Sequence, residues 1–248
     1  MKKPLLTVGL LLVTLASCVL AASPEAEKGP QRGKLLEAML DGPMAGVDQI
    51  VFAVRVSVRR HYYENFGHYL FPRDQYPLPP PGEFGPEEPL FGDGGRLCRL
   101  SLRTGKLTVL LDDPQGGVRD PQVHYDAEKI LFSYRKGGQP YYYLYEIHVD
   151  GSGLRQLTDG PYDDIEPTYL PDGGIIFCST RCRCVVGCNP SPVATLYWCD
   201  ASGERIRPIS ANPFTDNTPW MLPDGRVLYT RWEYVDRNQM TFHHLWTA

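Results

Sequence analysis

Hydrophobic and polar residues alternate in short stretches along this chain. In the segment "KILFSY", Ile130 and Phe132 fall on one side of an extended backbone, and Leu131 and Ser133 fall on the other. A period of two residues is typical of a β-strand whose faces meet different surroundings. The pattern predicts short strands, and the 24 glycines, 23 prolines and 15 tyrosines agree with many strands joined by tight turns.

The strands belong to a longer unit that is clearest in three places. The copies read "RDPQVHYDAEKILFSYR" from Arg119, "DIEPTYLPDGGIIFCSTR" from Asp164 and "DNTPWMLPDGRVLYTRWE" from Asp216. In each copy an acidic residue precedes a proline, and a turn and an apolar strand follow. Pro167 lies 46 residues after Pro121, and Pro219 lies 52 residues after Pro167.

A second half follows the first two copies. "YYLYEIHVDGSGLRQLT" and "ATLYWCDASGERIRPIS" each predict a strand, an Asp-containing turn and a further strand. "QIVFAVR" and "RLCRLSLRTGKLTVLL" fit an earlier and looser unit. Four strands per unit at this spacing are typical of propeller blades. The sequence therefore predicts an all-β fold, a β-propeller of four-stranded blades, with about three and a half blades in an incomplete ring.

An incomplete ring leaves unpaired strand edges. We therefore expect the chain to be the N-terminal part of a longer protein or a truncated reading frame. The alternative is a complete protein that closes its ring by oligomerisation. The predicted organisation is a signal peptide (1–22), a linker with a short helix (23–46) and a partial propeller (47–248), which carries an insertion at about 61–95.

The first residues predict export. Two lysines precede an apolar run that ends near Ala16, and small residues follow, which is typical of a signal peptide. The segment "LASC" also resembles the bacterial lipoprotein box, in which Cys18 would be lipidated. Ordinary cleavage near Ala21 or Ala22 is the alternative. Either route predicts an extracytoplasmic protein, periplasmic or secreted, which meets a membrane only through a lipid anchor at Cys18.

The repeats resemble those of the TolB-like Asp-repeat propellers of exported bacterial proteins, on segments such as "LPDGGIIFCSTR" and "DGSGLRQLTDG". The three long copies are similar to a group of large exported planctomycete-type proteins, whose propeller is classed with the middle domain of the hydrazine synthase alpha subunit. This resemblance covers about Gln49 to the last residue. It implies a propeller surrounded by haem-bearing domains that join nitric oxide and ammonia.

The sequence departs from a haem-bearing subunit. A covalently attached c-type haem requires CxxCH, and this motif is absent from the sequence. We therefore predict no cofactor for this chain; a haem or metal would enter only through missing domains or the cysteine cluster.

Four cysteines lie close together in "CSTRCRCVVGC": Cys178, Cys182, Cys184 and Cys188. In an exported loop between two strands, such a cluster favours disulfides. We expect Cys182 to pair with Cys188, and Cys178 or Cys184 to reach Cys199. A metal site and free thiols are the alternatives. The weak metal candidates are Cys182, Cys184 and Cys188, together with His61 and His68 of the insertion.

The residues around the repeated prolines form the second candidate site. They are Arg119, Asp120, Asp164, Glu166, Asp216 and Asn217. Each would precede the innermost strand of a blade, and in a propeller such positions face the central channel and one rim. One interpretation is that they cap turns and bond neighbouring blades. The other is that they bind a cation or a basic partner on the axis.

These observations predict a module that binds or scaffolds within a longer protein, with no catalytic activity of its own. Its partners would be other domains of that protein or a separate protein. A net charge of -4 argues against a nucleic-acid partner. The alternative is a fragment of a haem- or metal-dependent redox enzyme whose catalytic domains are missing here.

Overall fold

The fold is taken from a computed structural model, which describes residues 33–57, 91–186, 191–233 and 243–248. The predicted signal peptide with Cys18, most of the insertion with His61 and His68, and Cys188 lie outside these residues. Helix α1 (Lys34–Asp41) covers the short amphipathic stretch that precedes the strands. The described residues contain no helix with the length and hydrophobicity needed to cross a membrane.

The described strands form four antiparallel sheets. The first contains β1 (Gln49–Ser57), β2 (Phe91–Ser101) and β3 (Leu107–Asp113). The second contains β4 (Gly117–Val123), β5 (Lys129–Arg135), β6 (Tyr143–His148) and β7 (Arg155–Gln156). The third contains β8 (Asp164–Tyr169), β9 (Ile175–Ser179), β10 (Thr195–Cys199) and β11 (Arg207–Pro208). The fourth contains β12 (Asp216–Met221), β13 (Val227–Trp232) and β14 (His243–Thr247).

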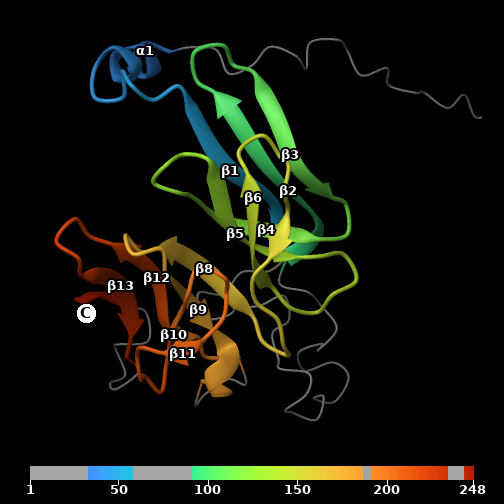
Figure 1. Cartoon of the computed structure of the whole chain (residues 1–248), viewed down its shortest axis with the longest axis vertical. Coiled ribbons are helices and arrows are strands. Elements are labelled where there is room, and N and C mark those ends of the chain that lie inside the picture. Colours follow the sequence, from blue (N-terminus) through green and yellow to red (C-terminus); the bar gives the residue numbers. More distant parts are fainter. Residues whose placement is uncertain (1–32, 58–90, 187–190, 234–242) are drawn as a thin grey trace, which may run out of the picture.

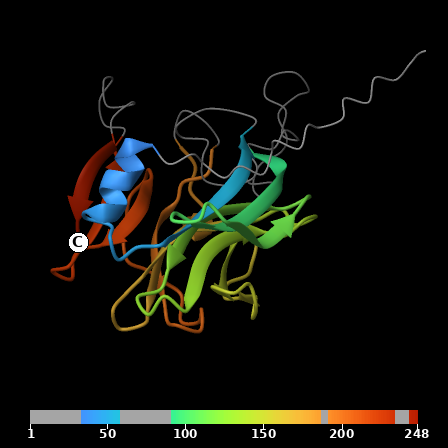
Figure 2. The ribbon, with the colours of Figure 1, turned by 90° about the horizontal axis from the view of Figure 1, so that it is seen from above.

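Each sheet packs against the next one in the sequence. Strand β4 contacts β1 and β2, β8 contacts β4 and β5, and β12 contacts β8 and β9. The first strands of successive sheets therefore touch one another and form the inner side of the arrangement. Figure 1 shows the sheets following one another in chain order, and the same succession is seen from above in Figure 2. The predicted blade architecture is confirmed.

The alternation of hydrophobic residues explains how the sheets pack. Ile130 and Phe132 face the first sheet, in a cluster with Leu97 and Val118. Leu131, on the other face of β5, joins the cluster shared with the third sheet. Burial on both faces requires apolar residues on both sides of a strand, which is why the second strands of the units are the most apolar segments.

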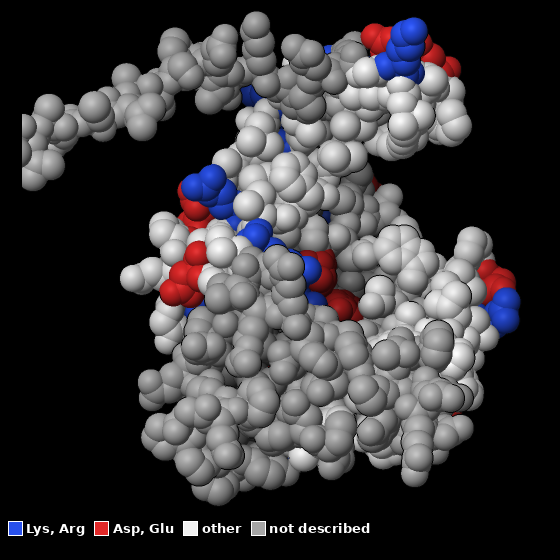
Figure 3. Space-filling model, turned by 180° about the vertical axis from the view of Figure 1, so that it is seen from behind, with Lys and Arg blue, Asp and Glu red and all other residues white. Residues whose placement is uncertain are grey.

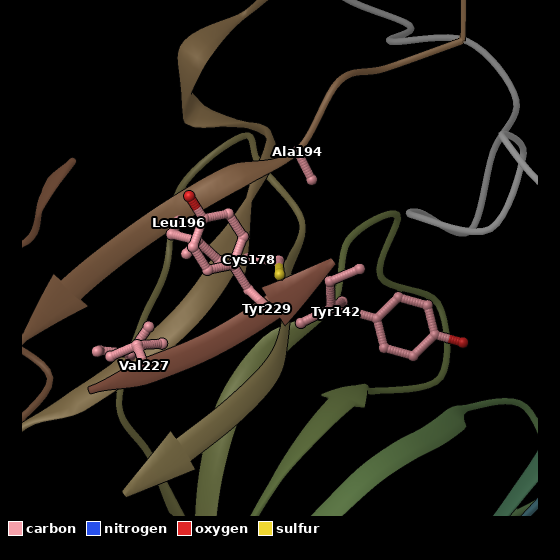
Figure 4. Close-up of a cluster of buried hydrophobic side chains, with 8 residues drawn as sticks. Tyr142, Cys178, Ala194, Leu196, Val227 and Tyr229 are labelled. Atoms are coloured by element: carbon pink, nitrogen blue, oxygen red, sulfur yellow. The ribbon is translucent and has the colours of Figure 1, made fainter. Parts of the chain in front are cut away.

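The third and fourth sheets share another cluster of buried residues, shown in Figure 4. Ile176 and Leu196 from the third sheet meet Val227 and Tyr229 from the fourth. Cys178 belongs to this cluster, and Figure 4 shows its sulfur between the side chains of Tyr229 and Tyr142. At about 25 cal/mol per Å² of apolar surface removed from water, such clusters supply the main force that holds neighbouring sheets together.

Candidate functional site

The innermost strands β4, β8 and β12 each carry a β-bulge next to their proline. Pairing shifts between Arg119 and Gln122, between Ile165 and Thr168, and between Asn217 and Trp220. The residues before the prolines, Asp120, Glu166 and Thr218, have φ of 56°, 53° and 54°. Proline cannot donate a ladder hydrogen bond, and a bulge is where a strand tolerates it. Positive φ is costly for residues other than glycine, so the same strained geometry is held at one position in three blades.

The bulged residues are bonded from one sheet to the next. The backbone N–H of Glu166 donates to Oδ2 of Asp120 at 3.2 Å, and it also lies 3.2 Å from the hydroxyl of Ser133. The backbone N–H of Thr218 donates to Oε2 of Glu166 at 2.6 Å. Each acidic side chain therefore accepts the free N–H of the bulge in the following sheet. We call this series, Asp120–Glu166–Thr218, the axial ladder.

Arg119 joins the axial ladder from the second sheet. Its side chain is only 4% exposed, and it lies 2.5 Å from Oδ2 of Asp120 and 3.2 Å from Oε1 of Glu166. Burial by itself would lower the pKa of Arg119, but the two carboxylates outweigh it and the pKa is raised. Arg119 is therefore a fixed positive charge that neutralises carboxylates from two sheets.

Glu166 is the centre of this network. Burial raises its pKa, and the charge of Asp120 raises it further, while Arg119 acts in the opposite direction. The thiol of Cys178 lies 3.6 Å from Oε2 of Glu166. Burial and this carboxylate raise the pKa of Cys178 well above its ordinary value, so the sulfur stays protonated. A protonated, fully buried thiol is neither a nucleophile nor a metal ligand.

The other predicted rim residues serve a different purpose. Asp164 and Asp216 are fully buried. Asp164 is paired at 2.7 Å with Arg181, in the short 3-10 helix Thr180–Cys182 that follows β9, and Asp216 is paired at 2.8 Å with Arg231 of β13. The serine hydroxyls of Ser179 and Ser210 each donate to one of these carboxylates at 2.6 Å.

These pairs fasten β8 to the segment that directly follows β9, and β12 to β13. The side chain of Asn217 is bonded to Thr230. The structure thus brings together Arg119, Asp120 and Glu166 and separates them from Asp164, Asp216 and Asn217. Figure 3 shows acidic and basic side chains meeting inside a hollow on one face of the molecule.

Sequence reasoning missed Asp163. Its side chain is buried, and Oδ1 accepts the backbone N–H of Tyr142 at 2.9 Å, across the junction of the second and third sheets. Burial raises its pKa to about 7, and the neighbouring charge of Asp164 adds to this. The only sequence signal is the doubled acid "DD", which does not show which of the two lacks a cationic partner.

The structure does not show the predicted disulfides to Cys199 among the described residues. Cys98, Cys178, Cys182, Cys184 and Cys199 are free thiols. Cys178 faces the fourth sheet, whereas Cys199 lies on the other face of the same sheet, against the second. Cys184 is exposed, and its thiol lies 3.4 Å from the carbonyl oxygen of Cys182.

The loop is instead held by a small core of its own. Val186 and Val193 pack against Trp232, which is 1% exposed. The thiol of Cys182 also lies 3.2 Å from the carbonyl oxygen of Val193. The predicted pairing of Cys182 with Cys188 lies outside the described residues. Within the described part of the chain, no group of three or more potential ligands is placed to hold a metal.

Comparison with known proteins gives one related sequence. Hydrazine synthase subunit alpha from Kuenenia stuttgartiensis is 30% identical over 166 residues, which cover 64% of this chain and 18% of that protein. No protein-family model matches the chain.

One solved structure supports the fold. Kuenenia stuttgartiensis hydrazine synthase aligns with a TM-score of 0.58 and 19% identity, over 81% of this chain and 30% of that one. A TolB structure from Agrobacterium tumefaciens gives a TM-score of 0.45 and 15% identity, over 77% and 80% of the two chains. The chain thus spans less than a third of the hydrazine synthase chain that it matches. The chain has a β-propeller fold and is similar in sequence and structure to a region of hydrazine synthase subunit alpha.

Proposed function

We propose that this chain is an exported propeller module that binds or scaffolds other parts of a longer protein. The observation that carries the proposal is the axial ladder with Arg119. Its carboxylates bond backbone N–H groups and a buried arginine of neighbouring sheets. Such bonds favour a rigid frame, since a carboxylate that holds two sheets together is poorly placed to exchange protons with a substrate.

The relative favours a scaffolding role inside a larger assembly. The matched region makes up 18% of hydrazine synthase subunit alpha. The chain carries no CxxCH in its sequence, so the redox chemistry of that enzyme is not proposed for it. Other domains of a longer chain, or a separate protein, are the proposed partners. We propose no catalytic activity for this chain alone.

Export rests on the N-terminal sequence, with its two lysines, apolar run and small residues. Cys18 is the proposed lipidation site if the lipoprotein route is used. Treating intact and permeabilised cells with a protease tests this. We expect degradation once the outer permeability barrier is opened, and survival until the cells are fully lysed would contradict export.

The second candidate function is a fragment of a redox enzyme, favoured by the 30% identity to hydrazine synthase subunit alpha. The haem or metal would then be held by other domains, or by Cys182, Cys184 and Cys188. The absorption spectrum and metal content of the purified product of the whole gene distinguish the two functions. A binding module gives only the protein absorbance near 280 nm. A Soret band, or a stoichiometric bound transition metal, would favour the enzyme.

A further inference from the structure

The turns between the first and second strands of three successive sheets are closed in a similar way, although the first turn is one residue longer than the other two. The N–H of His124, Leu170 and Leu222 donates to the carbonyl oxygen of Lys129, Gly174 and Arg226, respectively, at 2.8–2.9 Å. Each turn also contains one residue with positive φ, at Ala127, Gly173 and Gly225. Tyr125, Pro171 and Pro223 are therefore equivalent in position. The same holds for the carboxylates that follow them, Asp126, Asp172 and Asp224.

The three turns surround an apolar hollow of about 490 Å³. It is lined by Tyr125, Pro171, Met221, Leu222, Pro223 and Gly225. The hydroxyl of Tyr125 donates to the carbonyl oxygen of Tyr169 at 3.0 Å, which fixes the ring although the residue is 64% exposed. Trp220, next to Met221 in the sequence, is 53% exposed. An apolar hollow of this volume is within the range that receives ligands or anchoring side chains.

Carboxylates directly follow three of the lining residues in the sequence: Asp126 follows Tyr125, Asp172 follows Pro171 and Asp224 follows Pro223, and we call these the border carboxylates. Asp126, Glu128 and Asp172 are exposed, and among the described ion pairs none of them has a lysine or arginine partner, although Asp126 lies 2.8 Å from Nδ1 of His124. Asp224 is paired with Arg226 at 2.6 Å, but both side chains are more than half exposed, and such pairs contribute little. Lys129 is bonded to the carboxylate of Glu146 at 2.8 Å, so its charge is shared between Glu146 and the nearby border carboxylate of Asp126.

We propose that this hollow is a docking site for a protein segment in which an apolar or aromatic side chain is flanked by lysine or arginine. The apolar anchor would enter between Tyr125 and Pro223, and the basic residues would meet the carboxylates on the border. The inference rests on the proposed binding function and names the chemistry of the partner.

The test uses a fluorescent peptide, Lys-Leu-Trp-Leu-Lys, whose binding to the full chain is followed by fluorescence anisotropy. Two further peptides replace the lysines by glutamate or the apolar residues by serine. We expect binding of the first peptide alone, with an affinity that decreases as salt is added. The proposal would be overturned if the glutamate peptide bound as tightly as the lysine peptide. It would also be overturned if the chain bound neutral oligosaccharides and not the lysine peptide.

Two variants test the location of the site. Tyr125→Ala removes the exposed ring, and we expect binding to weaken about tenfold. The triple variant Asp126→Asn, Asp172→Asn and Asp224→Asn keeps the side-chain oxygens that accept the turn N–H groups. It removes three charges, and we expect weaker binding by about fivefold and a smaller salt dependence.

The matched control is the variant Asp150→Asn with Asp200→Asn. These residues bond their own turns in the same way, but at the outer hairpins. The control should bind like the unaltered chain. Unchanged binding by Tyr125→Ala in a folded protein would overturn the docking site. That result would leave the proposed function intact, because the spectrum and metal content test it separately.

Discussion

Glu166→Gln is the sharpest perturbation of the axial ladder. The glutamate accepts bonds from Arg119 of the second sheet, Cys178 of its own sheet and the N–H of Thr218 in the fourth. Glutamine has one acceptor oxygen, so its NH₂ group must face one of these donors. The charge that pairs with the buried Arg119 is lost at the same time.

The size of the effect follows from the burial of the pair. Breaking a buried ion pair costs about 3–5 kcal/mol when the remaining charge has no other partner. Arg119 keeps Asp120, and the raised pKa of Glu166 shows that its charged form is already disfavoured by burial. We therefore expect about 2 kcal/mol of destabilisation, or about 4–8 °C in Tm for a domain of this size.

Circular dichroism during thermal unfolding measures the change in Tm. Urea unfolding measures the change in the free energy of unfolding independently. The matched control is Glu204→Gln, at an exposed position in an outer turn, which should change Tm by less than about 1 °C. If Glu166→Gln unfolds within about 1 °C of the unaltered chain, Glu166 does not hold the sheets together and the reasoning is refuted.

Three further predictions follow from the buried groups. The pKa of Asp163 is about 7 in the folded chain against a reference value of 3.8, so the free energy of unfolding should fall as pH rises from about 4 to 7. This loss amounts to at most about 4 kcal/mol near pH 8, and Asp163→Asn should remove it. The same pH profile of unfolding in the variant and the unaltered chain would contradict the prediction. Arg181→Ala leaves the carboxylate of Asp164 buried without its cation, so urea unfolding should show a loss of about 3–5 kcal/mol, whereas a loss below 1 kcal/mol would count against the pair. Without reductant, Cys178 and Cys199 should resist iodoacetamide in the folded chain and react once it is unfolded; a peptide cross-linked through these two residues would show the opposite.

The fold could be predicted because the same local pattern recurs. The alternation in "KILFSY" and the repeated acid-proline pair fix the strands and their order, and each blade supports the interpretation of the others. The contacts within the site could not be predicted in the same way. Asp164 and Glu166 are two residues apart and would share a face in a regular strand. The bulge between Ile165 and Thr168 contains Glu166, so Asp164 meets Arg181 while Glu166 meets the neighbouring sheets.

The cysteines show the same limit. Their closeness in the sequence suggested disulfides, but β9 ends at Ser179. Cys178 therefore lies inside a sheet, whereas Cys182 and Cys184 lie beyond the end of the strand. The strand period then decides which core Cys178 enters. Cys199 lies on the strand that pairs with β9, yet it faces the opposite core. Face and register, which linear spacing does not report, determined the outcome.

Amide hydrogen exchange at Thr218 tests the central claim most directly. Thr218 is exposed at the surface, so its N–H would exchange quickly unless the carboxylate of Glu166 holds it at 2.6 Å. We predict slow exchange in the unaltered chain, at a rate close to that of the buried strands, and fast exchange in Glu166→Gln. Fast exchange at Thr218 in the unaltered chain would show that the sheets are not joined by the axial ladder.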